Sequence, residues 1–485
     1  MVKNASVDVN CGSVYQDSLP QAYSEGQVEE VTINESFERM ARIQFRLGLF
    51  DSTKKAKNNP EIDIASIDSP QHQQLALEAA LQSIVLLQNK NNLLPLDADE
   101  KKSLVVIGPH IDGNEVFMGN YHGARCDCPG DGGDYNCIES PLEAIKRKTR
   151  FPDEVNSVKG CNVADNDIIE ITKAVEAAKN SDVVILFLGL DGDEESEGHD
   201  RTKIGLPGLQ PKLMKGVLDV AGDKTIIVLI HGGTVSLGEE RSKAGAILST
   251  GYGGQAGSSA IASVLFGEFN PTGKLAATVY PASYVDELPL TEMGLRVGVG
   301  RTYMYYTGKA EFTFGHGLSY SKWRLNWVDV NGEIVESDRS DLLAPLKLFE
   351  FKSTRFHVSI QNLGPHLNGS SQSILLFWRP AKISIEDLTR KSSTAKKREI
   401  RQKLIGFEES RFLPVGESEM VEFYLNWKDF ALWDSEIGSS IVLPGTYELV
   451  IQVNDIQLTR RLEVVASNFQ GNSTHLRNHK QSLLQ

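Results

Sequence analysis

Six carboxylates crowd into one short segment of this sequence, between Gly189 and Arg201. The segment reads GLDGDEESEGHDR, and its acidic residues are Asp191, Asp193, Glu194, Glu195, Glu197 and Asp200. Because neighbouring carboxylates repel one another, at least one of them is expected to have a raised pKa. A carboxyl group with a raised pKa can act as a general acid near neutral pH. Arg201 is expected to hold another of these carboxylates ionised.

The residues just before this segment predict a strand that would position it. Residues 183–188 are apolar without alternation, which is typical of a strand buried on both faces of a parallel sheet. Ligands of open α/β sheets bind beyond the carboxyl ends of the strands, so the acidic segment would lie where a ligand binds. A solvated run of charges is the simpler interpretation, and the segment by itself leaves both open.

Strand and helix patterns alternate from residue 70 to residue 320. Helices are expected at 73–88, 142–148, 168–178, 209–220 and 258–266, and strands at 104–107, 155–158, 183–188, 226–230, 246–249 and 275–279. Such alternation predicts a mostly parallel six-stranded sheet with helices on both faces, an α/β sandwich. Glycines follow several of the strands, but none matches a nucleotide-binding motif, so tight turns are the favoured interpretation.

The remaining segments predict a second domain and its connections. Short stretches rich in β-branched and aromatic residues recur across 345–466, which is typical of an all-β sandwich of the fibronectin type III or immunoglobulin-like kind. Residues 51–69 and 321–344 are interpreted as linkers, and 467–485 as a disordered tail. Residues 1–50 combine a short polar segment with a helix from about Asn34, which is too little to bury a core.

The overall charge restricts the classes of partner. The formal net charge is −14 and the isoelectric point is near 5.3, which argues against nucleic acid or an anionic membrane as a partner. No stretch of about 18 apolar residues predicts a membrane-spanning helix, and the first residues have no signal-peptide pattern. A neutral or polar small substrate agrees with this balance, and no cofactor is expected.

Five cysteines are present, and their spacing favours disulfides over a metal site. Cys126, Cys128 and Cys137 form a C-x-C-x8-C cluster, without a fourth ligand at ordinary zinc spacing. Cys11 and Cys161 lie apart from the cluster. Four N-x-S/T sequons hint at secretion.

Seven segments, in order along the chain, resemble the carboxyl-terminal half of glycoside hydrolase family 3. They are HQQLALEAALQSIVLLQN, SLVVIGPHID, MGNYHG, GLDGDEESEGHDR, GYGGQAGSSAIASVLFGEFNPTGKLAATVYP, GRTYMYYTG and FTFGHGLSY. The most similar branch contains β-xylosidases and α-arabinofuranosidases. The resemblance implies a (β/α)8 barrel followed by the α/β sandwich and the fibronectin-like domain, with residues 1–50 as a remnant of the last barrel strand and helix.

The resemblance also implies roles for individual residues. The acid/base glutamate of the family matches Glu195, and Glu197 is the alternative. Asp8, Asp191, Glu197 and Arg201 are expected to contact the substrate. The nucleophilic aspartate of the family lies on a barrel strand before the segment that VDVNCGS resembles, which places it upstream of Met1, so no nucleophile is expected in this chain.

The same comparison places the usual partner of Cys11 upstream of Met1. Cys11 would then be left over, while Cys126, Cys128, Cys137 and Cys161 could pair among themselves. The missing targeting sequence would have the same explanation, a polypeptide that lacks most of its barrel.

The implied function is that of a retaining exo-glycosidase of the β-xylosidase type. It would remove terminal β-linked xylose or arabinose from xylan oligosaccharides of plant cell walls, and its full-length form would be extracellular. The alternative is a catalytically inactive, carbohydrate-associated or interaction module, because a retaining mechanism needs two carboxyl groups and the chain is expected to hold one of them. Oligosaccharide is the expected partner, and the oligomeric state stays open.

Overall fold

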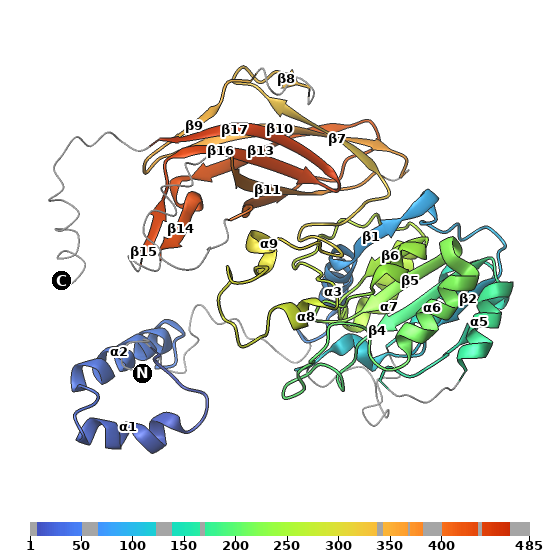
Figure 1. The fold of residues 1–485 in the computed structure, drawn as a ribbon, viewed down its shortest axis with the longest axis horizontal. Coiled ribbons are helices and arrows are strands. Elements are labelled where there is room, and N and C mark those ends of the chain that lie inside the picture. Colours follow the sequence, from blue (N-terminus) through green and yellow to red (C-terminus); the bar gives the residue numbers. More distant parts are fainter. Residues whose placement is uncertain are drawn as a thin grey trace. The chain divides into compact units, whose positions relative to one another are not determined.

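The computed structural model describes residues 7–50, 66–122, 138–164, 170–336, 343–366, 369–381, 400–434 and 439–465. The chain divides into two compact units, Met1–Ser69 and Pro70–Gln485 (Figure 1). Most of the expected linker 51–69 and the whole expected tail 467–485 lie outside the described residues.

The first unit contains two helices, α1 (Val14–Ser24) and α2 (Glu30–Arg46). The helix expected from about Asn34 therefore begins four residues earlier. Residues 7–10 have no regular secondary structure, and α1 was not expected from the sequence. Neither helix has a buried residue, which agrees with the expectation that this segment is too short to form a core.

The second unit begins with the α/β domain, whose sheet confirms the predicted number of six strands and their mostly parallel arrangement, with five of the predicted strands present. The strand order is β1-β6-β5-β4-β2-β3, and β1 alone is antiparallel to its neighbour. The strands are β1 (Val85–Asn89), β2 (Leu104–Ile107), β3 (Val155–Val158), β4 (Val183–Gly189), β5 (Thr225–Ile230) and β6 (Ala246–Ser249).

Two boundaries in this sheet differ from the prediction. The helix expected at 73–88 is α3 (Pro70–Ser83), and the apolar run that follows it forms β1 instead. A short apolar run is compatible with a helix or a buried strand, so periodicity could not separate the two. Residues 275–279, which were expected to form a strand, are not part of the sheet. Instead, Val279 makes an isolated antiparallel β-bridge to Phe312.

Helices cover both faces of the sheet, and this explains why β4 lacks alternation (Figure 1). The helices α3, α4 (Pro141–Lys148) and α7 (Gly257–Leu265) contribute to the core on one face. The opposite core receives α5 (Ile171–Asn180) and α6 (Gln210–Ala221). Side chains of β4 enter these two cores in turn, and every residue of the strand is buried. Two short helices, α8 (Tyr284–Glu287) and α9 (Thr302–Tyr305), follow.

The second domain is a β-sandwich, as predicted. One sheet has the order β13-β10-β7-β8, the other β12-β11-β16-β17-β9, and β14 pairs with β15. The strands are β7 (Lys322–Val328), β8 (Ile334–Val335), β9 (Leu346–Phe349), β10 (Ser353–Gly364), β11 (Ser373–Pro380), β12 (Lys403–Glu409), β13 (Ser418–Asn426), β14 (Ala431–Asp434), β15 (Ser439–Val442), β16 (Gly445–Val453) and β17 (Ile456–Val465). Aromatic and aliphatic side chains from both sheets form one core.

The segment 321–344, expected to be a linker, holds strand β7. This strand pairs with β10 and places Trp323, Leu325 and Trp327 in the core of the sandwich. Lys322 and Arg324, on either side of Trp323, are exposed and give the segment its polar character, whereas Asn326 is buried. The alternation is that of a strand with one buried face, so the sandwich begins directly after the α/β domain.

Polar side chains join the two domains of the second unit. Asn270 is buried, donates to Ser370 Oγ at 2.7 Å and accepts from the backbone N–H of Tyr320 at 2.8 Å. Lys274 Nζ donates to the carbonyl of Gly317 at 3.0 Å and to Asn454 Oδ1 at 3.1 Å. Burial lowers the pKa of Lys274 to about 7, although Asp455 nearby opposes this.

Lys274 should therefore make the stability of this unit depend on pH. Its pKa is about 7 in the folded chain against an ordinary value of 10.5, so between these values the unfolded state binds more protons and the free energy of unfolding should rise with pH. The expected slope from this residue is up to about 1.4 kcal/mol per pH unit. Lys274→Met should lose this slope in urea unfolding at several pH values, and Lys322→Met, which changes an exposed lysine, should keep it. If the free energy of unfolding changed with pH by the same amount in wild type and in Lys274→Met, this account would be contradicted.

Candidate functional site

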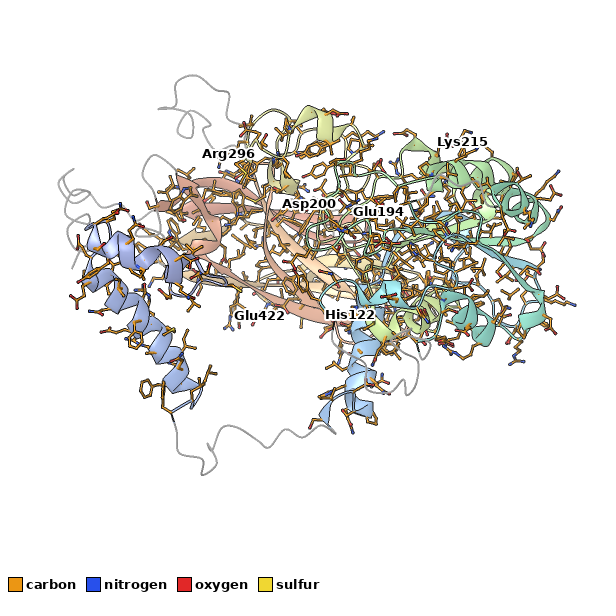
Figure 2. The ribbon with its side chains drawn as sticks, turned by 90° about the horizontal axis from the view of Figure 1, so that it is seen from below. His122, Glu194, Asp200, Lys215, Arg296 and Glu422 are labelled. Carbon is orange, nitrogen blue, oxygen red and sulfur yellow. The ribbon has the colours of Figure 1, made fainter. Side chains whose placement is uncertain are left out.

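Loops from neighbouring strands converge at the carboxyl end of the parallel sheet. His110 follows β2, the acidic segment follows β4, His231 follows β5 and Tyr252 follows β6. Two residues of the acidic segment, Glu194 and Asp200, are labelled in Figure 2. The order β6-β5-β4-β2 makes these strands direct neighbours, so residues far apart in sequence meet at one edge.

The end of β4 is held by a buried glutamine. Gln210, the first residue of α6, is completely buried. Its side chain accepts from the backbone N–H of Gly189 and donates to the carbonyl of the same residue, both at 2.8 Å. A Cβ atom on Gly189 would lie 1.8 Å from the carbonyl oxygen of Ile230, so only glycine is compatible with this packing. The acidic loop therefore leaves the sheet from a fixed point.

The carboxylate of Glu195 is bound by donors from two other loops. Its Oε1 accepts from the backbone N–H of Gly232 at 2.5 Å and from the hydroxyl of Tyr252 at 2.8 Å. Its Oε2 accepts from the N–H of Gly233 at 3.0 Å and lies 3.5 Å from Arg201 Nη2. The side chains of Glu195 and Arg201 are only 18% and 14% exposed. We call this arrangement of Gly232, Gly233, Tyr252 and Arg201 around Glu195 the carboxylate cradle.

The two glycines of the cradle leave room for the close approach of the carboxylate and the guanidinium. A Cβ atom on Gly232 would lie 2.9 Å from Glu195 Oε1, and one on Gly233 would lie 2.7 Å from Arg201 Nη2. Any side chain here would push the carboxylate or the guanidinium away from the backbone donors. The structure thus gives this glycine pair a role in binding Glu195 beyond that of a tight turn.

The other carboxylates of the loop have different surroundings. Asp191 Oδ1 accepts from the backbone N–H groups of Asp193 at 3.1 Å and Glu194 at 3.3 Å, which closes the first turn of the loop. Burial raises the pKa of Asp191, and the charge of Asp193 adds to the effect. Glu197 is exposed, and the hydroxyl of Tyr121 donates a hydrogen bond to it. The expected raised pKa within the segment therefore belongs to Asp191.

Family comparisons agree with this architecture. Residues 84–320 match the Glycosyl hydrolase family 3 C-terminal domain, and residues 390–454 match the Fibronectin type III-like domain. The chain belongs to glycoside hydrolase family 3.

Individual relatives are similar over nearly the whole of this family 3 chain. "Probable beta-D-xylosidase 7" of Arabidopsis thaliana is 33% identical over 479 residues, covering 94% of this chain and 58% of that protein. "Beta-xylosidase/alpha-L-arabinofuranosidase 1" of Medicago sativa subsp. varia is 32% identical, covering 92% and 56%. A solved GH3 exo-beta-xylosidase, XlnD, in complex with a xylobiose aziridine probe has a TM-score of 0.74 at 25% identity, covering 95% and 57%. The chain thus spans a little over half the length of these relatives.

The structure brings together part of the predicted site of this family 3 chain. Asp191, Glu195, Glu197 and Arg201 belong to one loop, and Glu195 and Arg201 form an ion pair. Asp8 belongs to the first unit, where Arg39 Nη2 lies 2.8 Å from its Oδ1 and their hydrogen bond lowers the pKa of Asp8. The structure therefore gives Asp8 a partner within its own unit.

Two of the five cysteines, Cys11 and Cys161, lie among the described residues. Cys161 is a free thiol buried in the core, and burial raises its pKa to about 11, so the expected pairing of four cysteines is wrong for this residue. Cys11 is free and exposed. The C-x-C-x8-C cluster lies outside the described residues. Within the described residues there is no group of three or more metal-binding side chains, and no helix there combines the length and apolar character needed to cross a bilayer.

Four contributors to the site were not anticipated from the sequence: His110, Gln210, His231 and Tyr252. His231 contacts Ser249 Oγ through Nε2 at 2.9 Å, and burial lowers its pKa. Burial and the hydrogen bond to Glu195 raise the pKa of Tyr252, which therefore stays a donor. The only available signal was position, because three of the four come shortly after a predicted strand.

The carboxylate cradle should contribute to stability in a way that Glu197 does not. Glu195→Gln removes the charge that pairs with Arg201 and leaves an N–H donor facing other donors, so it should cost about 1–3 kcal/mol of unfolding free energy. Glu197→Gln, an equivalent change two residues away at an exposed position, should cost less than about 0.5 kcal/mol. Urea unfolding of the two variants measures the difference. A loss for Glu195→Gln no larger than that for Glu197→Gln would contradict this role of the cradle.

Proposed function

We propose that this chain provides the proton-donating part of a retaining exo-glycosidase of the β-xylosidase type. The proposed substrates are xylan oligosaccharides with terminal β-linked xylose or arabinose, and the proposed place of action is outside the cell. The supporting observation is the acidic loop at the carboxyl end of the parallel sheet, with one carboxylate anchored and another exposed two residues later. The names of the relatives, β-xylosidases and α-L-arabinofuranosidases, support the choice of sugar.

The geometry favours Glu197 over Glu195 as the proton donor. A general acid must present a protonated oxygen to the leaving group. Oε1 of Glu195 accepts from the N–H of Gly232 and the hydroxyl of Tyr252, and Oε2 accepts from the N–H of Gly233 with Arg201 beside it, so this carboxylate already has partners on both oxygens. Glu197 is exposed, and its hydrogen-bond partner Tyr121 is itself 79% exposed. We therefore assign the acid/base role to Glu197 and an anchoring role to Glu195, which reverses the order expected from the resemblance.

In the proposed reaction a second carboxylate attacks the anomeric carbon while Glu197 protonates the glycosidic oxygen. The bond to the leaving sugar breaks, and a glycosyl ester forms on the attacking carboxylate. Glu197, now ionised, then takes a proton from the water that attacks this ester, and the sugar is released with its configuration retained. In this proposal the attacking carboxylate is an aspartate of a family 3 barrel, and no residue of this chain is assigned that role.

The decisive experiment supplies that barrel. The chain is joined to the barrel of the Medicago relative and assayed on nitrophenyl β-xyloside, with proton NMR to identify the first anomer released. We expect turnover with retention from the joined protein and none above background from the 485-residue chain. A joined protein that folds but does not hydrolyse the substrate would favour an inactive carbohydrate-associated module. Turnover by the chain alone would contradict the absence of a nucleophile.

The same joined protein separates the two glutamates. Glu197→Ala should lower turnover about 10²–10⁴-fold on substrates with poor leaving groups, and azide should restore turnover of the nitrophenyl substrate, because a small anion can replace the missing base. Glu195→Ala should lower activity without azide rescue. Rescue of Glu195→Ala instead would assign the acid/base role to Glu195.

A further inference from the structure

A second buried carboxylate binds the loop after β5, residues 231–238. The side chain of Glu311 is only 5% exposed. Its Oε1 accepts from the hydroxyl of Ser236 at 2.6 Å and from the N–H of Gly238 at 3.0 Å, and its Oε2 accepts from the N–H of Leu237 at 3.0 Å. Three neighbouring residues of one loop therefore donate to one carboxylate.

Glu311 is itself held by contacts that lie far from this loop in the sequence. Its backbone N–H donates to the carbonyl of Val279 at 2.8 Å, and Phe312 makes the isolated β-bridge to the same residue. The guanidinium of Arg241 lies over the ring of Phe312, with Cζ 5.5 Å from the ring centre. Its Nε lies 3.9 Å from Oε2 of Glu311. The carboxylate is thus a fixed acceptor, because the backbone that carries it is paired and a cation lies beside it.

The loop after β5 also provides the backbone donors of the carboxylate cradle. Gly232 and Gly233, which bind Glu195, are exposed, whereas residues 235–237 are buried. Glycine has more backbone freedom than any other residue, so a glycine pair does not fix its own conformation. Its position therefore depends on what holds the chain on either side, which is the end of β5 before it and the contacts of Glu311 after it.

The same loop contacts the chain at and beyond the end of the acidic segment. Arg201 Nη2 donates to the carbonyl of Thr234 at 3.2 Å, and the N–H of Ser236 donates to the carbonyl of Ile204 at 2.7 Å. Ser236 is therefore bound to this chain by its backbone and to Glu311 by its side chain. A displacement of Ser236 would move both the glycine pair and the partners of Arg201.

We propose that Glu311 is a positioning residue, whose carboxylate holds the loop after β5 in the conformation that binds Glu195. In the proposed glycosidase it acts on proton donation only through this loop and the carboxylate cradle, without contact to the substrate. The catalytic part of this inference rests on the proposed function, whereas the effect on the loop is a property of this chain and needs no turnover to be detected.

Hydrogen–deuterium exchange of the purified 485-residue chain tests the effect on the loop. Glu311→Gln keeps the shape of the side chain but turns an amide N–H₂ group toward other donors. Peptides that contain Gly232 and Gly233 should therefore exchange about tenfold faster. The matched control is Glu139→Gln, which removes the charge of a carboxylate bound between α4 and α7 and should leave exchange at the glycine pair unchanged.

Ser236→Ala is a second variant, for the case that thermal unfolding shows Glu311→Gln to be unfolded. It removes one of the three donors and leaves two backbone N–H groups on the carboxylate, so exchange at the glycine pair should rise by a smaller factor, about threefold. Exchange at the glycine pair that is equal in wild type and in the folded variants would overturn the proposal. An equal rise in Glu139→Gln would overturn it as well.

Turnover by the joined protein tests the catalytic part. Xylobiose needs a proton on its leaving sugar, whereas nitrophenyl β-xyloside needs little help because nitrophenolate is a stable anion. Glu311→Gln should therefore lower kcat for xylobiose about tenfold and leave kcat for the nitrophenyl substrate within about twofold. An equal loss on both substrates would show a merely structural role and overturn the catalytic part. A joined wild-type protein without turnover would refute the proposed function, while faster exchange in Glu311→Gln would still support the role of Glu311 in the loop.

Discussion

The carboxylate of Glu195 determines how the loops of the α/β domain are arranged. It belongs to the loop after β4, yet its hydrogen-bond donors come from the loops after β5 and β6. A carboxylate that accepts several backbone N–H bonds is a strong electrostatic contact, since the donors are fixed by the backbone itself. This interaction ties the loop that carries Glu197 to the loops after β5 and β6. Without it, the acidic segment would be the solvated run of charges that its composition suggests.

The fold class could be predicted from the sequence because the hydrophobic patterns that indicate helices and strands are local and periodic. The continuous apolar run of β4 indicated a doubly covered strand, and every residue of it is buried. The same argument failed for β1, whose short apolar run followed a helix without a break. It failed for a different reason in β7, where the exposed Lys322 and Arg324 flank the buried Trp323 and made the segment look like a polar linker. Patterns shorter than two helical turns do not distinguish the alternatives.

The candidate site was only partly predictable because its contacts join separate loops. The acidic segment stood out by composition, and the resemblance to family 3 supplied expected roles for Glu195 and Glu197. Neither source could show that Gly232 and Gly233 bind the carboxylate of Glu195, which lies 37 and 38 positions before them in the sequence. Nor could they show that Tyr252 and Arg201 complete its set of partners. Charge crowding correctly suggested a raised pKa, but burial decided that it belongs to Asp191.

Gln210 has a consequence for how such proteins diversify. Its amide hydrogen-bonds both backbone groups of Gly189, much as the backbone of an adjacent strand would, and so completes the sheet where the chain leaves it. Residues 190–209 therefore form a loop whose two ends, Gly189 and Gln210, are hydrogen-bonded to each other. A change of length or composition within this loop can therefore leave the register of β4 unchanged, because Gly189 keeps both of its hydrogen bonds to Gln210.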